Sequence, residues 1–113
     1  MNTGSNSEKR RHPRAEIKWP VVMMAHDGLV DGKTANLSLG GAFIRFPEHS
    51  NLNHTLSMVI TAKSRLISLT AELIWVDTHS QGEKSKSSGI GVRFTKIMMS
   101  DRQFLHRAIN NHL

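Results

Sequence analysis

Apolar side chains recur at every second position in several short stretches of the chain, which is the spacing of β-strands with one buried face. The stretches are residues 17–23, 34–37, 42–46, 55–61, 65–76 and 89–95. Turn signals separate them: Asp27-Gly28, a second candidate at Asp31-Gly32, and the pair Gly40-Gly41. The hydrophilic run 77–88 predicts a long hairpin loop before the last strand. The pattern therefore predicts about six strands joined mainly by short connections.

The C-terminal segment has helical spacing instead. Its apolar stripe consists of Phe104, Leu105, Ala108 and Ile109, and Ser100 with Gln103 before it forms a capping-box sequence. We expect this stripe to face the strands rather than a membrane or a partner, because the polar face is short and only modestly basic. The predicted fold is mainly β: a six-stranded antiparallel β-barrel, whose closure removes exposed strand edges, with one C-terminal α-helix.

The length of 113 residues allows one small domain. We divide it into a flexible N-terminal arm at 1–16, a β-barrel at 17–97 and a helix of the same domain at 98–113. The arm is predicted to be mobile because residues 1–8 are polar and rich in Asn, Ser and Gly. This segment lacks the apolar core of a secretory signal, and no stretch is long enough to span a bilayer, so we expect a soluble protein without membrane insertion.

The charge balance favours anionic partners. Fifteen Lys and Arg against nine Asp and Glu give a formal net charge of +6, which suits nucleotides, nucleic acids, acidic proteins or anionic membrane surfaces. Nucleic acid is the less favoured of these, because the chain has no Tyr and few aromatic residues for base stacking. The absence of cysteine excludes disulfides and thiolate chemistry and permits a reducing cytoplasm.

Two polar motifs carry the candidate chemistry. The first is Arg10-x-x-x-Arg14, with Arg11 inside it, and the second is Asn36-x-Ser38-x-x-Gly41. Arginine can grip a phosphate bidentately or pair with guanine O6 and N7, whereas Asn and Ser offer both donors and acceptors. Glycine lets the backbone approach a ligand closely. A basic tail alone is more often a solvated arm, but the two motifs together predict a split site for phosphates and guanine edges.

In the order and spacing of these motifs the chain resembles the PilZ family, whose members carry RxxxR followed by D/NxSxxG and bind the bacterial second messenger cyclic di-GMP. Here Asn36 stands where Asp is commoner. The resemblance continues through Gly89-Ile90-Gly91-Val92-Arg93-Phe94, which is similar to the family's closing strand. It implies the same six-stranded barrel and a cytoplasmic, noncatalytic receptor for cyclic di-GMP, bound as one molecule or as an intercalated dimer, which signals to an unidentified downstream protein.

The resemblance assigns a role to each motif residue. Arg10 and Arg14 are expected at phosphates and guanine Hoogsteen edges, with Arg11 as a third contact. Asn36 and Ser38 are expected at a guanine base, and Gly41 has a steric and conformational role. In the mechanism that we expect, ligand binding orders the arm over the turn at 36–41 and thereby changes a partner-binding surface.

Two further residues are candidates with a stronger alternative. Trp75 is either a core residue, which is the commoner outcome for an alternating tryptophan, or a contact of a guanine. Arg93 either assists an anion site or simply faces water, as exposed arginines in strands usually do.

Other function classes find little support in the sequence. The histidines show no metal-ligand spacing, and we expect no metal and no other cofactor. No nucleophile elbow, catalytic pair or P-loop is present, so we expect no enzyme. The remaining alternative is an interaction adaptor of the same fold, or a basic barrel that binds nucleic acid nonspecifically.

Overall fold

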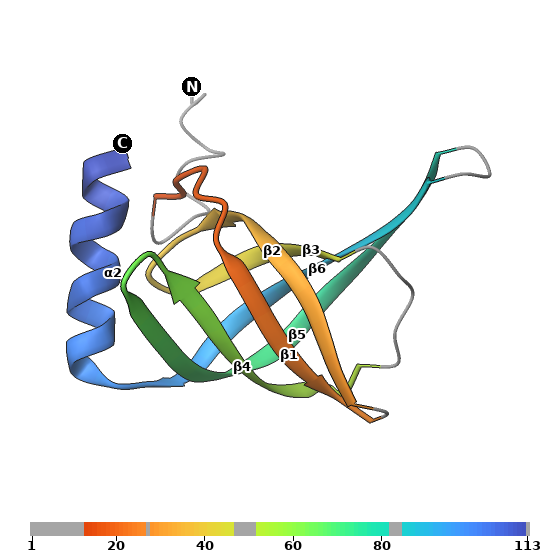
Figure 1. The fold of residues 1–113 in the computed structure, drawn as a ribbon, viewed down its shortest axis with the longest axis horizontal. Helices are drawn as coiled ribbons and strands as arrows, with labels where there is room; N and C mark the ends of the chain where they lie inside the picture. The colour runs from red at the N-terminus through yellow and green to blue at the C-terminus, as the bar shows by residue number, and fades with distance from the viewer. Residues whose placement is uncertain (1–12, 27, 47–51, 82–84, 113) are drawn as a thin grey trace, which may run out of the picture.

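In the computed structural model, which describes residues 13–26, 28–46, 52–81 and 85–112, antiparallel strands close into a barrel (Figure 1). Its strands are β1 (Pro20–Ala25), β2 (Gly28–Leu37), β3 (Gly41–Phe46), β4 (Thr55–Ala62), β5 (Arg65–Gln81) and β6 (Ser85–Ile97). Their order around the barrel is β1-β2-β3-β6-β5-β4, and β4 pairs with β1 to complete the closure. The predicted six-stranded antiparallel barrel is thus confirmed.

The barrel core follows the alternation seen in the sequence. Along each strand, successive side chains point alternately into the core and toward the outer surface. In β4, for example, Leu56, Met58 and Ile60 are buried while Thr55 and Ser57 are exposed. The inner face of β3 consists of Ala42, Ile44 and Phe46.

Two local predictions are wrong. Asp31-Gly32 is not a turn, because both residues pair with β1 inside β2. The stretch 77–88 is mostly strand rather than loop: β5 and β6 remain paired from Asp77 with Gly89 to Gln81 with Ser85. The two strands therefore form a hairpin that extends away from the barrel (Figure 1).

The helix α2 (Met99–His112) packs against the barrel through the predicted stripe. Leu105 and Ile109 are buried in the core cluster, and Phe104 stacks on Trp19 with ring centroids 6.2 Å apart. At the first turn Arg65 Nε donates to the largely buried Asp101 carboxylate at 2.9 Å. The helix begins at Met99, so Ser100 lies within its first turn rather than at the predicted cap position.

The segment that precedes β1 pairs with β2, and this pairing determines the position of Arg14. Ala15 forms a β-bridge with Leu37 through two backbone hydrogen bonds of 2.9 Å. The buried Thr34 hydroxyl accepts from Trp19 N at 2.9 Å and donates to Ile17 O. These hydrogen bonds hold the segment along β2, and they give the buried Thr34 hydroxyl both a donor and an acceptor partner.

Candidate ligand-binding site

The bridge between Ala15 and Leu37 brings the two sequence motifs together. In an antiparallel bridge the flanking residues face each other in reverse order, so Arg14 lies opposite Ser38. Ala15 and Leu37 point into the core, at 2% and 0% exposure. Their neighbours therefore point outward, and Arg14 is indeed exposed.

The turn from Ser38 to Gly41 is held by the serine hydroxyl. Ser38 Oγ accepts from the backbone N–H of Gly40 at 3.2 Å and of Gly41 at 3.1 Å, and it donates to Gly41 O at 3.3 Å. The Ser38 backbone N–H also donates to Gly41 O at 2.9 Å. A hydroxyl has one donor and two acceptor sites, so all three are used within the turn. A contact between Ser38 and a ligand base would have to replace one of these bonds.

Gly41 lies where two strand backbones approach closely. It pairs with Arg93 of β6, and a Cβ built on Gly41 would lie 2.1 Å from the carbonyl oxygen of Val92. No side chain fits there. This geometry agrees with the steric role expected of Gly41.

Across the sheet from Gly41 lies an ion-pair network. Gly41 of β3 pairs with Arg93 of β6, which pairs with Glu72 of β5, so these residues form one row across three strands. Arg93 donates to Glu72 Oε1, and His54 Nε2 lies 3.1 Å from Glu72 Oε2. The Arg93 guanidinium side chain is 64% exposed. We call these residues, together with Ser38 and Arg14, the polar row.

The carboxyl group of Glu72 has a lowered pKa. Hydrogen bonding from Arg93, followed by that from His54, lowers the pKa of Glu72 below its ordinary value of 4.5. The carboxylate is therefore ionised throughout the neutral range.

The neighbouring row is aromatic. Asn36 of β2 pairs with Phe43 of β3, Phe43 pairs with Gly91 of β6, and Gly91 pairs with Trp75 of β5. The Phe43 and Trp75 rings stack with centroids 5.0 Å apart and an interplanar angle of 15°. We call these four residues the aromatic row.

Glycines on β6 make room for the two rings. A Cβ on Gly91 would lie 2.3 Å from Trp75 Nε1, and a Cβ on Gly89 would lie 2.5 Å from the Phe43 ring. The rings therefore occupy the space that side chains at Gly89 and Gly91 would fill on the outer surface of β6. Phe43 is 9% exposed and its ring is flanked by the Arg45 guanidinium at 4.8 Å, whereas Trp75 remains 45% exposed.

The structure thus gathers the predicted residues that it describes on one outer face of β2, β3, β6 and β5. They are Arg14, Asn36, Ser38, Gly41, Trp75 and Arg93. Arg10 and Arg11 lie outside the described residues. The core alternative for Trp75 is wrong, because its indole lies on the outer surface. Phe43 and Glu72 were missed, since only the strand register shows that they share rows with the motif residues.

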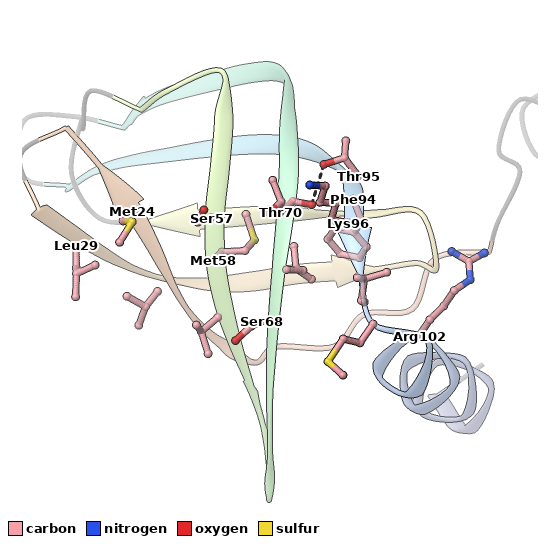
Figure 2. A pocket seen from close by; sticks show the side chains of 15 residues that line it. Met24, Leu29, Ser57, Met58, Ser68, Thr70, Phe94, Thr95, Lys96 and Arg102 are labelled. Atoms are coloured by element: carbon pink, nitrogen blue, oxygen red, sulfur yellow. Dashed lines mark hydrogen bonds between the residues drawn. The ribbon is translucent and has the colours of Figure 1, made fainter.

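A groove lies on another part of the outer surface, across β1, β4, β5 and β6 (Figure 2). The residues that line it include Val22, Val59 and Ile97. Met24 and Leu29 lie at one end, and Arg102 lies at the other. None of the predicted site residues that the structure describes lines this groove.

Among residues 13–26, 28–46, 52–81 and 85–112, no three His, Cys, Asp or Glu side chains come together as a metal site. In the same part of the chain, no helix has the length and apolar character needed to cross a membrane.

The family model described as PilZ domain matches residues 8–111. No curated protein sequence matches the chain. Solved structures with the same fold include the PilZ domain of YcgR from Escherichia coli with c-di-GMP (TM-score 0.74, 15% identity, covering 92% of this chain and 91% of that one).

Two longer proteins share the fold with this chain. MrkH from K. pneumonia, in a complex with c-di-GMP, has a TM-score of 0.75 and 18% identity over 90% of this chain and 51% of its own. The inhibitor of motility MotI/DgrA from Bacillus subtilis has a TM-score of 0.74 and 16% identity over 90% of this chain and 50% of its own. The chain therefore spans about half the length of these two proteins. At such identities the likeness shows a shared fold.

Proposed function

The chain belongs to the PilZ domain family, and on this premise we propose that it is a noncatalytic receptor for cyclic di-GMP. The observation that carries the proposal is the bridge between Ala15 and Leu37, which sets Arg14 of the first motif opposite Ser38 of the second. The YcgR and MrkH structures that share the fold contain c-di-GMP, which supports the choice of ligand.

The polar row supplies groups for the phosphates and the guanine Hoogsteen edge. Arg14 and Arg93 are exposed guanidinium groups at the two sides of the turn at Ser38–Gly41. Arginine forms bidentate, charge-assisted bonds with phosphate and with guanine O6 and N7. We assign Arg10 and Arg11 to the same ligand, approaching from the arm that precedes Arg14. Because Gly41 has no side chain, a ligand can approach the backbone at this position.

The aromatic row supplies a platform for a base. Trp75 stacks on Phe43 and its indole lies close against Gly91, and these contacts hold the ring while almost half of its surface stays exposed. Stacking of a base on such a ring contributes roughly 1–3 kcal/mol by alanine substitution. Asn36, at the other end of the row, offers one acceptor and two donors to a base edge.

The signal would pass through the arm. We propose that ligand binding orders the part of the arm that precedes the bridged Ala15 over the site, because Arg10 and Arg11 come only a few residues before that bridge. The ordered arm would change the surface that an unidentified downstream protein contacts. An intercalated dimer of the ligand would engage Arg11 as well as Arg10 and Arg14. The natural setting of such a receptor is the cytoplasm, where a second messenger acts.

Calorimetric titration at near-physiological salt tests the proposal. We expect saturable binding of cyclic di-GMP and much weaker binding of GMP and cyclic di-AMP. Arg14→Ala and Trp75→Ala should each weaken cyclic di-GMP binding by about tenfold or more. Lys96→Ala is the matched control, since Lys96 is an exposed cation of β6 that lies in the groove and outside both rows. Equal affinity for all three nucleotides would refute the proposal.

The net charge of +6 favours one alternative, a basic barrel that binds polyanions or an acidic partner without selecting guanine. Binding of that kind releases counterions, so its affinity falls steeply as salt rises, by a power close to the number of phosphates neutralised. A steep salt slope together with indifference to the base would establish this alternative. A shallow slope with guanine preference supports the receptor.

A further inference from the structure

Glu72 occupies an unusual place for a carboxylate in a site for an anionic ligand. It stands at the end of the polar row, next to Arg93, and its side chain is 31% exposed. Trp75 follows it on the same strand, beyond an irregularity between Leu73 and Trp75. Their partners Arg93 and Gly91 are two residues apart on β6, so the two rows are separated by roughly 7 Å. A base lying on Trp75 is therefore within reach of Glu72.

Two neighbours hold the Glu72 carboxylate in place, and they occupy only some of its hydrogen-bond acceptor positions. Arg93 donates to Oε1, and His54 contacts Oε2 at 3.1 Å. An ionised carboxylate has about four acceptor positions, so about two are left after these bonds. The two neighbours also fix its orientation, which reduces the entropy lost when a ligand binds.

The remaining acceptor positions of Glu72 match the hydrogen-bond donors of guanine. The Watson–Crick edge of guanine presents two adjacent donors, the ring N1–H and the exocyclic 2-amino group, which a carboxylate can accept side by side. Adenine presents an acceptor at N1 and would face the carboxylate with a lone pair. We propose that Glu72 selects guanine by accepting these two donors from a base stacked on Trp75. This inference rests on the proposed function, because it assumes that cyclic di-GMP binds at the two rows.

A purely electrostatic role for Glu72 has the opposite consequence. If its carboxylate only held Arg93 and repelled phosphate, removing the charge would free Arg93 and strengthen binding of any cyclic dinucleotide. If Glu72 accepts hydrogen bonds from guanine, removing its charge weakens binding only of ligands whose base carries these donors. The sign of the change therefore separates the two roles.

The experiment compares cyclic di-GMP with cyclic di-IMP, whose base differs from guanine only in lacking the 2-amino group. Affinities are measured by calorimetry for the wild type, Glu72→Gln and the control Asp31→Asn, which removes one exposed negative charge from β2. We expect the wild type and the control to prefer cyclic di-GMP by on the order of tenfold. Glu72→Gln should lose most of this preference, mainly through weaker binding of cyclic di-GMP.

Two outcomes would overturn the inference, and they differ from each other. If Glu72→Gln binds both ligands with the wild-type ratio of affinities, Glu72 does not contact the base, whatever happens to the absolute affinity. If the wild type binds neither ligand, the proposed function itself fails, and the inference fails with it. Circular dichroism of each variant shows that the barrel is intact, which the exposed position of Glu72 leads us to expect.

Discussion

At the scale of single residues, the second motif shapes the backbone as much as it offers groups to a ligand. The Ser38 hydroxyl is saturated by the backbone of its own turn, and Gly41 is required because β3 and β6 approach too closely for a Cβ. The spacing of Ser38 and Gly41 is therefore the spacing of a folded turn. Asn36 and Arg14 have no such role in the turn, whereas a ligand contact of Ser38 would have to replace one of its turn bonds.

Replacing Gly41 with alanine should destabilise the whole barrel. The new Cβ would meet the Val92 carbonyl at 2.1 Å, and because this neighbour is backbone, the two strands themselves must separate. We expect a loss of about 1–3 kcal/mol in the free energy of unfolding, measured by urea denaturation.

Ser38→Ala is the comparison for Gly41→Ala. It removes hydrogen bonds from the same turn without adding an atom, and should cost about 1 kcal/mol. An alanine at position 41 that leaves stability unchanged would contradict the close approach of β3 and β6.

The stabilising effect of the Glu72 network should depend on acid pH. The native pKa of Glu72 is lowered, first by the bond from Arg93 and then by that from His54, so folding favours the ionised form. Its contribution is present above pH 4.5 and is lost as the pH falls through the lowered native pKa. We expect the wild type to exceed Glu72→Gln in stability by a small amount at neutral pH, because the pair is exposed, and the difference to shrink below pH 4.5. Urea denaturation at several pH values measures this, and a difference that does not vary with pH would refute the linkage.

At the scale of elements, β5 shows where sequence periodicity succeeds and where it fails. From Ile67 through Leu69 to Ala71 the alternation correctly identifies the inward face. The register with β6 then shifts between Thr70 and Ala71, and again between Leu73 and Trp75. At the first shift the extra residue, Thr95, lies on β6, whereas at the second the extra residue, Ile74, lies on β5. The extra residue on β5 changes which face the following β5 side chains occupy. For this reason Trp75, which continues the apolar alternation in the sequence, lies on the outer surface of the folded protein.

The hairpin between β5 and β6 was predicted, but the continuation of both strands through residues 77–81 and 85–88 was missed for a different reason. Residues 77–88 are hydrophilic, and strand prediction from the sequence relies on a buried apolar face. In this hairpin the backbone hydrogen bonds continue beyond the barrel, from Asp77 with Gly89 to Gln81 with Ser85, without needing that alternation. The helix was predictable because its stripe packs on the core at regular spacing, and β4 was predictable because its pairing with β5 has no irregularity.

Helix α2 should contribute strongly to stability through its buried stripe. Leu105 is fully buried between the helix and the barrel, so Leu105→Ala should cost about 2–5 kcal/mol in the free energy of unfolding. Gln103 is exposed on the same helix, and Gln103→Ala should change stability by no more than about 0.5 kcal/mol. Denaturant unfolding of the two variants measures both values. Equal small effects would show that the helix does not close the core.

At the scale of the whole molecule, the outer surface of the closed barrel has two distinct regions. One outer face, on β2, β3, β6 and β5, carries the polar and aromatic rows. The apolar groove lies across β1, β4, β5 and β6 (Figure 2), so β5 and β6 take part in both surfaces. The sequence predicted the family and the barrel, and most of the residues that it proposed for the site lie together on one outer face. It did not predict that they form rows, because this depends on pairing between strands far apart in the chain.

The most direct test of the whole proposal is the location of bound cyclic di-GMP. We would titrate isotope-labelled protein with the ligand and follow backbone amide shifts by NMR. We predict the largest changes at Arg14, the turn at Ser38–Gly41, Trp75 and Arg93, which lie on the face of the two rows. Changes confined to the groove around Val59 and Ile97, or no change at saturating ligand, would contradict the assignment of this face as the cyclic di-GMP site.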